Sequence, residues 1–379
     1  MKFTINRAVF TAKLNDVLRA ISSKTTIPIL TGLKIAVSDQ DVTLTGSDAD
    51  ITIETVLPSS EESTNLTIEQ AGAIVLPARF FSEIVKKLPD KLVTIEVSDG
   101  FQAQITSGSA AFTINGQDAN NYPHLPEIET KDGVSLAGDV LKEIIGQTVL
   151  AVSTQESRPI LTGIHLVLAD NQLFAVATDS HRLAQRKITL PQAVQERYDV
   201  IIPGKSLTEL SRMITDSQAT VELRIAENQV LFVLGNTMFY SRLLEGNYPE
   251  TSRLIPETED TTIELNAAGF LAAIERASLL SHESRNNVVK LSVTAADNTA
   301  KITGNSPDVG NVEEAITTTS LSGADLEISF NPDYMKDALR SFGQSEIRLS
   351  FTSALRPFTL VPTQDAENFI QLITPVRTY

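Results

Sequence analysis

The chain carries the stretch Pro28-Ile29-Leu30-Thr31-Gly32 and repeats it unchanged as Pro159-Ile160-Leu161-Thr162-Gly163, 131 residues later (159 − 28). The same separation pairs Gly46-Ser47-Asp48-Ala49-Asp50 with Ala177-Thr178-Asp179-Ser180-His181. Each copy of the first stretch follows an amphipathic segment and precedes a run of residues typical of a strand. Self-similarity at a fixed separation indicates repeated structural units, so we expect one fold to occur more than once in this chain.

A second repeated marker indicates where the units are joined. Asn121-Tyr122-Pro123 recurs as Asn247-Tyr248-Pro249, and each copy lies in a proline-bearing stretch typical of a connection between domains. A third copy follows by pattern, because Ile263-Glu264-Leu265 leads into the apolar run 270–280 and then into alternating residues. The length of 379 residues also suggests several domains of roughly 100–200 residues each. We therefore predict three domains, at residues 1–126, 127–254 and 255–379.

Each unit is expected to contain two halves, because similar helices follow Leu76-Pro77-Ala78, Ile202-Pro203-Gly204 and Asn331-Pro332-Asp333. A proline near the start of a helix fixes φ where the first N–H groups have no helical partner. Segments such as 93–97 and 219–225 alternate apolar and polar residues, which is typical of antiparallel sheets with one buried face. The predicted fold class is therefore α+β, with two helices and antiparallel sheets in each domain. So many strands disfavour a doubly wound nucleotide-binding sheet.

Composition limits the function classes. The chain has no cysteine, which excludes disulfides and thiolate chemistry and fits a reducing cytoplasm. No apolar run approaches the roughly 18–20 residues of a membrane span, so we expect neither export nor a membrane partner. The net charge of −16 argues against nucleic acid as a partner, since phosphates need a basic surface. The predicted helical stretches nevertheless carry fourteen Lys and Arg against nine Asp and Glu, so a basic face is possible within an acidic protein.

Two stretches resemble catalytic motifs, but neither meets the requirements of its motif. Gly204-Lys205-Ser206 is similar to the end of a phosphate-binding loop, but Asp199 occupies the required earlier glycine position. Asp179-Ser180-His181 contains the side chains of a hydrolase triad, yet three consecutive residues do not usually converge on one reacting atom. We therefore predict no catalytic residues and no cofactor.

Metal sites are not expected either. The four histidines, His124, His165, His181 and His282, lack the spacing of zinc ligands. Asp48 and Asp50 could hold a divalent ion, but they lack the rest of a calcium loop, and turn hydrogen bonds explain them better.

The ordered set of motifs resembles one known family. Its most specific members are Pro28-Ile29-Leu30, Leu76-Pro77-Ala78-Arg79, Thr178-Asp179-Ser180-His181-Arg182-Leu183 and the tail Pro375-Val376-Arg377. In this order and spacing, the chain resembles the β subunits of bacterial DNA polymerase III, the sliding clamps, from end to end. The resemblance implies three clamp-type domains per chain and a head-to-tail homodimer that forms a closed ring, with helices lining the hole.

The same resemblance implies a non-catalytic DNA replication protein, a processivity factor that encircles duplex DNA without reading its sequence. Its implied partners are double-stranded DNA, the DNA polymerase III alpha-type subunit and other polymerases, a clamp-loader ATPase, and a second copy of the chain. Polymerases would be tethered through a hydrophobic peptide-binding pocket.

The family's functional residues map onto matching positions of this sequence. The implied partner pocket comprises Leu161, Thr178, Ser180, His181, Arg182, Leu183, Pro256, Leu355, Pro357, Leu372, Thr374, Pro375, Val376 and Arg377. The implied DNA contacts are Lys24, Arg79, Gln155, Arg158, Lys205 and Arg285. The implied dimer contacts are Phe112 and Ile114 on one side and Leu279, Leu280, Glu313 and Glu314 on the other.

The chain departs from the family pattern at several positions. Ser180 stands where many relatives have glycine, and Thr374 where methionine is common. The stretch Ser109-Ala110-Ala111 lacks the basic residues that some relatives place opposite the glutamates, so we expect apolar contacts to dominate the dimer.

Simpler explanations exist for individual residues of these sets. An isolated leucine is by default a core residue, and a single helix-surface Lys or Arg is usually just solvated. A hydrolase or other enzyme would need convergent proton donors and acceptors, which the sequence lacks. A repeat scaffold without nucleic acid explains the repeats but not the basic helices.

Overall fold

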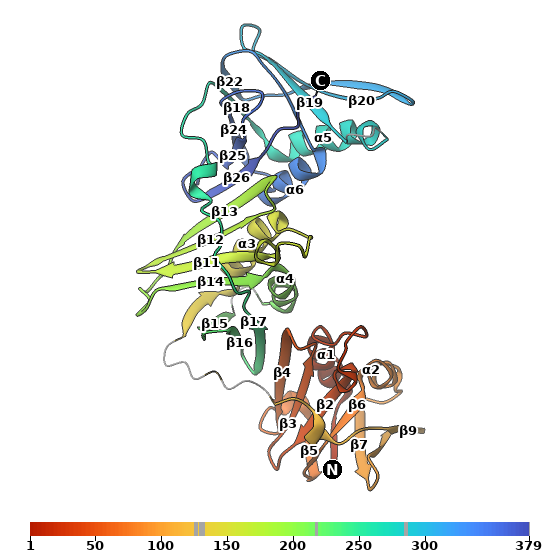
Figure 1. Cartoon of the computed structure of the whole chain (residues 1–379). Helices are drawn as coiled ribbons and strands as arrows, with labels where there is room; N and C mark the ends of the chain where they lie inside the picture. Colours follow the sequence, from red (N-terminus) through yellow and green to blue (C-terminus); the bar gives the residue numbers. More distant parts are fainter. Residues whose placement is uncertain (125–127, 129–132, 217–218, 284–286, 379) are drawn as a thin grey trace. The chain divides into compact units, whose positions relative to one another are not determined.

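The computed structural model describes residues 1–378 except 125–127, 129–132, 217–218 and 284–286. The chain divides into two compact units (Figure 1). Unit 1 comprises Met1–Asp139 and Glu209–Leu243, and unit 2 comprises Val140–Thr208 and Leu244–Tyr379.

Unit 1 contains helices α1 (Arg7–Leu18) and α2 (Ala78–Lys87) and two antiparallel sheets. Its strands are β1 (Lys2–Asn6), β2 (Gly32–Val37), β3 (Asp41–Ser47), β4 (Ile51–Pro58), β5 (Thr67–Gln70), β6 (Gly72–Pro77), β7 (Leu92–Ser98), β8 (Gln102–Ser107), β9 (Ala110–Asn115), β10 (Val134–Ala137), β15 (Thr220–Ile225), β16 (Gln229–Leu234) and β17 (Thr237–Arg242). Their orders are β5-β1-β7-β8-β9 and β10-β15-β16-β17-β4-β3-β2-β6.

Unit 2 contains helices α5 (Ala267–Ser281) and α6 (Pro332–Phe342), while α3 (Gly138–Thr148) and α4 (Gly204–Met213) each include residues of both units. Its strands are β11 (Gly163–Ala169), β12 (Gln172–Thr178), β13 (Arg182–Thr189), β14 (Tyr198–Pro203), β18 (Thr261–Asn266), β19 (Val289–Thr294), β20 (Thr299–Ser306), β21 (Gly310–Ile316), β22 (Ser320–Gly323), β23 (Leu326–Phe330), β24 (Glu346–Phe351), β25 (Phe358–Pro362) and β26 (Phe369–Ile373). Their orders are β14-β11-β12-β13-β26-β25-β24-β18-β22 and β21-β20-β19-β23.

One sheet in each unit joins strands that lie far apart in the sequence. In unit 1, β17 pairs antiparallel with β4, with Phe239 opposite Ile53. In unit 2, β13 pairs antiparallel with β26, with Leu183 opposite Leu372 (Figure 1). Each of these sheets combines strands from two predicted domains, so the compact units are not the predicted domains. The boundaries after residues 126 and 254 therefore stay predictions.

The repeated pentapeptide forms the same local structure twice. Pro28–Thr31 and Pro159–Thr162 are both short 3-10 helices. In each, the threonine hydroxyl donates to the proline carbonyl, at 2.8 Å in the first copy and 2.6 Å in the second. The glycine that follows begins a strand, and a Cβ atom at Gly32 would lie 2.4 Å from Val75 Cγ1. Close approach of the neighbouring strand thus explains why glycine ends the repeated stretch.

Helix starts follow the capping chemistry of the sequence. Asn6 Oδ1 accepts the N–H of Ala8 at 2.9 Å, and Asn266 Oδ1 accepts the N–H of Gly269 at 3.0 Å. Asn331 caps α6 in the same way, and Pro332 occupies its first turn. These side chains satisfy N–H groups that the first helical turn leaves without partners.

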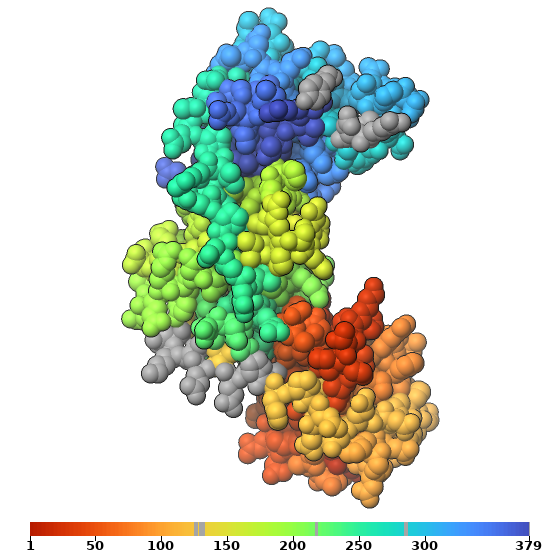
Figure 2. Space-filling model, viewed as in Figure 1, coloured from red at the N-terminus to blue at the C-terminus, as the bar shows by residue number. Residues whose placement is uncertain are grey.

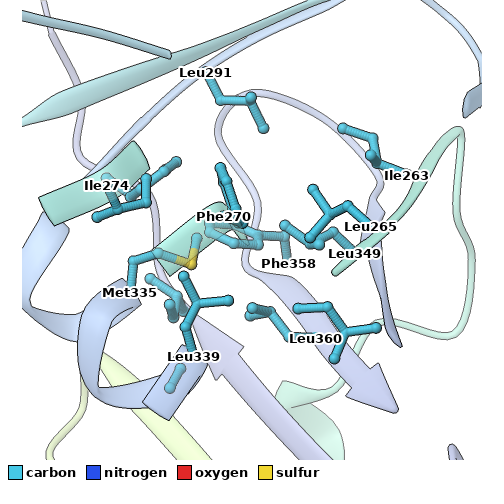
Figure 3. Close-up of a cluster of buried hydrophobic side chains, with 14 of the residues drawn as sticks. Ile263, Leu265, Phe270, Ile274, Leu291, Met335, Leu339, Leu349, Phe358 and Leu360 are labelled. Carbon is cyan, nitrogen blue, oxygen red and sulfur yellow. The ribbon is translucent and has the colours of Figure 1, made fainter. Parts of the chain in front are cut away.

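The core of unit 2 packs α5 and α6 against the sheet strands (Figure 3). Phe270 and Ile274 from α5 meet Met335 and Leu339 from α6, and Phe358 from β25 lies beside them. All five are buried, and burial of each such side chain contributes about 1.5–3 kcal/mol. Across the described residues, no helix is both long and apolar enough to cross a membrane.

Candidate partner pocket and DNA-contacting residues

The second repeated sequence, 46–50 and 177–181, forms the same turn twice. Asp179 Oδ1 accepts the N–H groups of His181 and Arg182 at 2.9 and 3.0 Å. Asp48 Oδ1 accepts those of Asp50 and Ile51 at 3.0 and 2.8 Å. This confirms the prediction that Asp48 makes turn hydrogen bonds.

The residue after each aspartate has left-handed backbone geometry, with φ of 79° at Ser180 and 80° at Ala49. A glycine would adopt this geometry without strain. The serine that departs from the family pattern therefore keeps the turn that glycine favours.

In unit 2, this turn opens onto a hollow of about 190 Å³, which we call the polar hollow. Its lining consists of Val152, Ser153, Thr154, Gln155, Arg158, Leu161, Asp179, Ser180, His181, Arg182 and Tyr334. Four of these belong to the predicted partner pocket and two, Gln155 and Arg158, to the predicted DNA contacts. Arg158 Nη1 donates to Ser180 Oγ at 3.1 Å, so the two predicted sets share one site.

Arg182 fixes the turn to helix α6. Its Nε donates to Asp179 Oδ2 at 3.0 Å, and its Nη1 donates to Asp337 Oδ2 at 2.7 Å. The guanidinium also lies 4.5 Å from the ring centroid of Tyr334, within the range of a cation–π contact. Arg182 thus has a structural role and is also available at the wall of the polar hollow.

The predicted apolar anchors are core residues in this structure. Leu161, Leu183 and Leu372 are all at least 96% buried. Leu183 and Leu372 form a small cluster with Val176, against which Phe174, Tyr248 and Ile255 pack; we call these six residues the apolar cluster. These three leucines are therefore core residues in this structure, which is the default interpretation of an isolated leucine.

A second hollow, of about 590 Å³, lies beside the apolar cluster and we call it the connector groove. Its sheet side is formed by His165, Phe174, Gln185, Lys187 and Ile370. Its other side is the connector, residues 244–260, which runs over the surface of unit 2 (Figure 2). Pro256 is the predicted pocket residue that lines this groove.

Other predicted pocket residues line neither hollow. They are Thr178, Leu355, Pro357, Thr374, Pro375, Val376 and Arg377, together with the buried Leu183 and Leu372. Leu355 is 61% exposed, and the tail is tied down because Thr374 N–H donates to the His181 carbonyl at 2.9 Å.

Sequence reasoning missed three members of the apolar cluster, Phe174, Tyr248 and Ile255, which pack against Val176, Leu183 and Leu372. The repeated Asn-Tyr-Pro marker is the available signal for Tyr248, but the pattern alone indicates only a boundary between domains.

The predicted DNA contacts are exposed side chains in both units. Lys24 and Arg79 belong to unit 1, and Gln155, Arg158 and Lys205 to unit 2. Arg79 and Lys205 are each the second residue of a helix, α2 and α4 respectively. Arg285 lies outside the described residues. Within their observed bounds, the helices contain eleven Lys and Arg and eight Asp and Glu. This excess of basic residues is smaller than the excess in the predicted stretches, which contain fourteen basic and nine acidic residues.

The predicted dimer residues lie on two edge strands and one helix. Phe112 and Ile114 are on β9, the edge of its sheet, and Phe112 is 42% exposed. Leu279 and Leu280 are on α5, where Leu279 is 70% exposed. Phe80 on α2 is also 70% exposed.

Glu313 and Glu314 lie on the other edge strand, β21, and both have partners within the chain. Glu314 accepts a hydrogen bond from Arg276 Nε at 2.8 Å, and Lys301 Nζ lies 3.1 Å from Glu313. Arg276 and Lys301 of the same chain therefore neutralise the charges of these two glutamates, although residues 109–111 include no basic side chain. In the part of the chain that the structure describes, no group of three or more His, Cys, Asp or Glu could hold a metal ion.

Comparisons with known proteins match the whole chain. Models of the DNA polymerase III beta subunit match residues 1–126 (N-terminal domain), 135–250 (central domain) and 252–377 (C-terminal domain). The beta sliding clamp of Bacillus subtilis is 53% identical over 380 residues, and that of Staphylococcus aureus 45% identical, each match covering 100% of both chains.

Solved structures agree with these relatives. The crystal structure of the DNA polymerase sliding clamp from Bacillus subtilis has a TM-score of 0.97 at 53% identity. The DNA polymerase III beta chain from Streptococcus pneumoniae has a TM-score of 0.96 at 46% identity, and both matches cover 100% of each chain. The α+β fold of three similar domains, predicted from the repeats and the resemblance, is confirmed. The chain therefore belongs to the DNA polymerase III beta subunit family, and its function is that of a non-catalytic processivity clamp.

Proposed function

We propose that two copies of this chain join head to tail into a closed ring around duplex DNA, with domains at residues 1–126, 127–254 and 255–379. The observation that carries this proposal is the full-length match to sliding clamps. DNA and a polymerase are the partners that the family implies. The clamp-loader ATPase and the second copy of the chain are part of our proposal, as is residence in the cytoplasm, where these partners act.

The two edge strands support self-association. Strands β9 and β21 each end a sheet and leave one row of backbone N–H and C=O groups without a partner strand among the described residues. Pairing β9 of one copy with β21 of the next would satisfy both rows, and such a heterologous contact closes into a ring when its rotation closes. Phe112 on β9 and Leu279 on α5, the helix that contacts β21, supply exposed apolar area at these edges.

Few cationic side chains would touch the DNA. Lys24, Arg79, Arg158 and Lys205 are long, exposed donors suited to phosphate oxygens, and Gln155 adds a neutral donor. Contacts with the backbone orient a duplex without reading its bases. With a net charge of −16, the protein would be held on DNA by encirclement rather than by affinity.

Partner proteins would be tethered at the polar hollow and the adjoining apolar cluster. The polar hollow offers the donors Arg158, His181 and Arg182. The partly buried members of the apolar cluster, Phe174, Tyr248 and Ile255, offer apolar area in the connector groove. A short extended peptide with apolar side chains from an alpha-type polymerase subunit, or from another polymerase, fits this mixture.

Retention on circular DNA tests the ring. Labelled protein is loaded onto nicked circular DNA, washed at moderate salt, and half the sample is linearised with one restriction cut before gel filtration. We expect the protein to stay with the circle and to leave the linear DNA, because only topology holds it. Equal retention on both, with the ends unblocked, would show that affinity holds the protein and would overturn the proposal.

A further inference from the structure

Tyr248 connects the connector to the turn of the polar hollow. Its hydroxyl accepts the backbone N–H of Thr178 at 3.0 Å. Thr178 is the first residue of that turn, because its Oγ1 accepts the N–H of Ser180 at 3.2 Å and donates to the Arg182 carbonyl at 2.6 Å. Thr178 is 4% exposed, so water cannot readily replace the tyrosine as acceptor.

His165 holds the ring of Tyr248 in place. The two rings stack with centroids 5.0 Å apart and an interplanar angle of 24°. His165 Nε2 lies 2.7 Å from Asp199 Oδ1, and Arg197 Nη2 lies 3.2 Å from Asp199 Oδ2. A continuous series of contacts thus runs from Asp199 on the edge strand β14, through His165 and Tyr248, to the turn at Thr178.

Unit 1 contains a repeat of this tyrosine, but in the part of the chain that the structure describes its hydroxyl makes no hydrogen bond of normal geometry like the one from Thr178 to Tyr248. Tyr122 is the repeat counterpart of Tyr248, and Lys34, the counterpart of His165, has its Nζ 6.0 Å from the Tyr122 ring centroid. The Tyr122 hydroxyl faces the backbone of Ser47, but among the described residues it makes no hydrogen bond of normal geometry. Among the described residues, the copy in unit 2 joins its tyrosine hydroxyl, through a hydrogen bond of normal geometry, to a turn that lines the polar hollow.

We propose that Tyr248 and His165 are positioning residues for partner binding, an inference that rests on the proposed function of the polar hollow. The Tyr248 hydroxyl fixes Thr178, and Thr178 sets the positions of Ser180, His181 and Arg182, which line the hollow. Without the hydroxyl, the buried N–H of Thr178 must find another acceptor, and the turn spends less time in the binding conformation. Apparent affinity falls in proportion to the fraction of molecules in that conformation.

The test compares Tyr248→Phe with Tyr122→Phe in the full chain. Each variant loses one hydroxyl at the same position of the repeat. Affinity is measured by fluorescence anisotropy with a labelled peptide from the alpha-type polymerase subunit, well below the melting temperature of every variant. We expect Tyr248→Phe to weaken binding about tenfold and Tyr122→Phe to leave it unchanged. A purely structural role of Tyr248 would lower its melting temperature without changing peptide affinity, and that result would overturn the proposal.

Two further variants distinguish failure of the positioning role from failure of the proposed peptide site. His165→Phe retains the ring stacking but removes the hydrogen bond to Asp199, so we expect a smaller loss of affinity in the same direction; this variant decides the matter if Tyr248→Phe does not fold. His181→Ala removes an exposed side chain of the polar hollow and should weaken binding if the hollow is the peptide site. Loss of affinity in His181→Ala alone would refute the positioning role. Wild-type affinity in all variants would refute both the positioning role and the proposed site.

Discussion

At the scale of single residues, Arg182 holds the turn to α6 and also lines the polar hollow, the proposed partner site. Its side chain is 14% exposed and is shared between Asp179 in the turn and Asp337 on α6. A charge with this little exposure is stabilised only while its partners remain. The same side chain also forms part of the wall of the polar hollow, so substituting it tests folding before it tests binding.

We expect Arg182→Ala to lower the free energy of unfolding by about 2 kcal/mol, because it leaves the poorly exposed Asp179 carboxylate without its cation. Urea unfolding followed by circular dichroism measures this change. The matched control is Arg253→Ala, whose ion pair with Glu250 joins side chains that are 80% and 61% exposed. Such a surface pair should contribute well under about 1 kcal/mol. Equal effects of the two substitutions would contradict the structural role of Arg182.

Ionisation of the repeated tyrosines, Tyr122 and Tyr248, is expected to destabilise the fold at alkaline pH. Burial raises the pKa of Tyr248 to about 12, and burial also raises the pKa of Tyr122. The folded state therefore favours the neutral phenols, and this stability is fully present below the unfolded pKa of about 10. It is lost as the pH rises through the folded pKa values.

We expect the melting temperature to fall as the pH is raised from 9 toward 12, and the double variant Tyr122→Phe/Tyr248→Phe to fall less steeply. Differential scanning calorimetry in a pH series measures both slopes. Tyr240 and Tyr334, whose pKa values burial also raises, remain in the double variant and should preserve part of the decline. Identical slopes in the two proteins would show that the repeated tyrosines are not responsible.

At the scale of elements, the edge strands and helix α5 carry the proposed ring contact. Leu279 is 70% exposed on α5, next to the half-buried Leu280, and Glu314 on β21 is already paired with Arg276. Charge on this surface is thus balanced within the chain. Apolar burial is left as the main source of affinity between copies.

Replacing Leu279 and Leu280 together by alanine should produce monomers. If each leucine becomes buried in the dimer, its loss costs about 2 kcal/mol, and two such losses weaken association by about a thousandfold. Size exclusion with light scattering gives the mass in solution at micromolar concentration. Leu355→Ala is the control, because Leu355 is 61% exposed but lies outside the proposed interface. A double variant that remains dimeric would place the interface elsewhere.

At the scale of the whole molecule, charge and topology have separate roles. The net charge of −16 opposes nonspecific binding to DNA, while a few exposed cations remain available for phosphate contacts. A closed ring allows weak contacts and long retention together, since retention does not depend on the contacts.

We expect alanine substitution of Lys24, Arg79 and Lys205 to weaken binding to linear DNA but to leave retention on nicked circles unchanged. Each lost phosphate contact should reduce the slope of log affinity against log salt by about 0.9. Fluorescence anisotropy in a salt series gives the slope, and gel filtration gives the retention. Substitution of the exposed Lys187, which lines the connector groove, is the control. Loss of retention on circles in the triple variant would mean that contacts, rather than encirclement, hold the protein.

The sequence by itself determined the repeated architecture. Two stretches recur 131 residues apart, and each pair forms the same local structure, because a 3-10 helix or an aspartate-capped turn depends on neighbouring residues. The α+β class was predictable for the same reason, because alternation of apolar and polar residues is also a local pattern. The resemblance also indicated the family, which the comparisons then showed.

Only the tertiary structure decided which residues meet. Gln155 and Arg158, predicted to contact DNA, line the same hollow as Ser180 and His181, because the pairing of strands β11 to β13 brings the 3-10 helix Pro159–Thr162 and the Asp179 turn together. Burial of Leu183 depends on its pairing with Leu372, which lies 189 residues away (372 − 183). Such contacts follow from the register of distant strands and from packing against the connector, and no local pattern in the sequence specifies them.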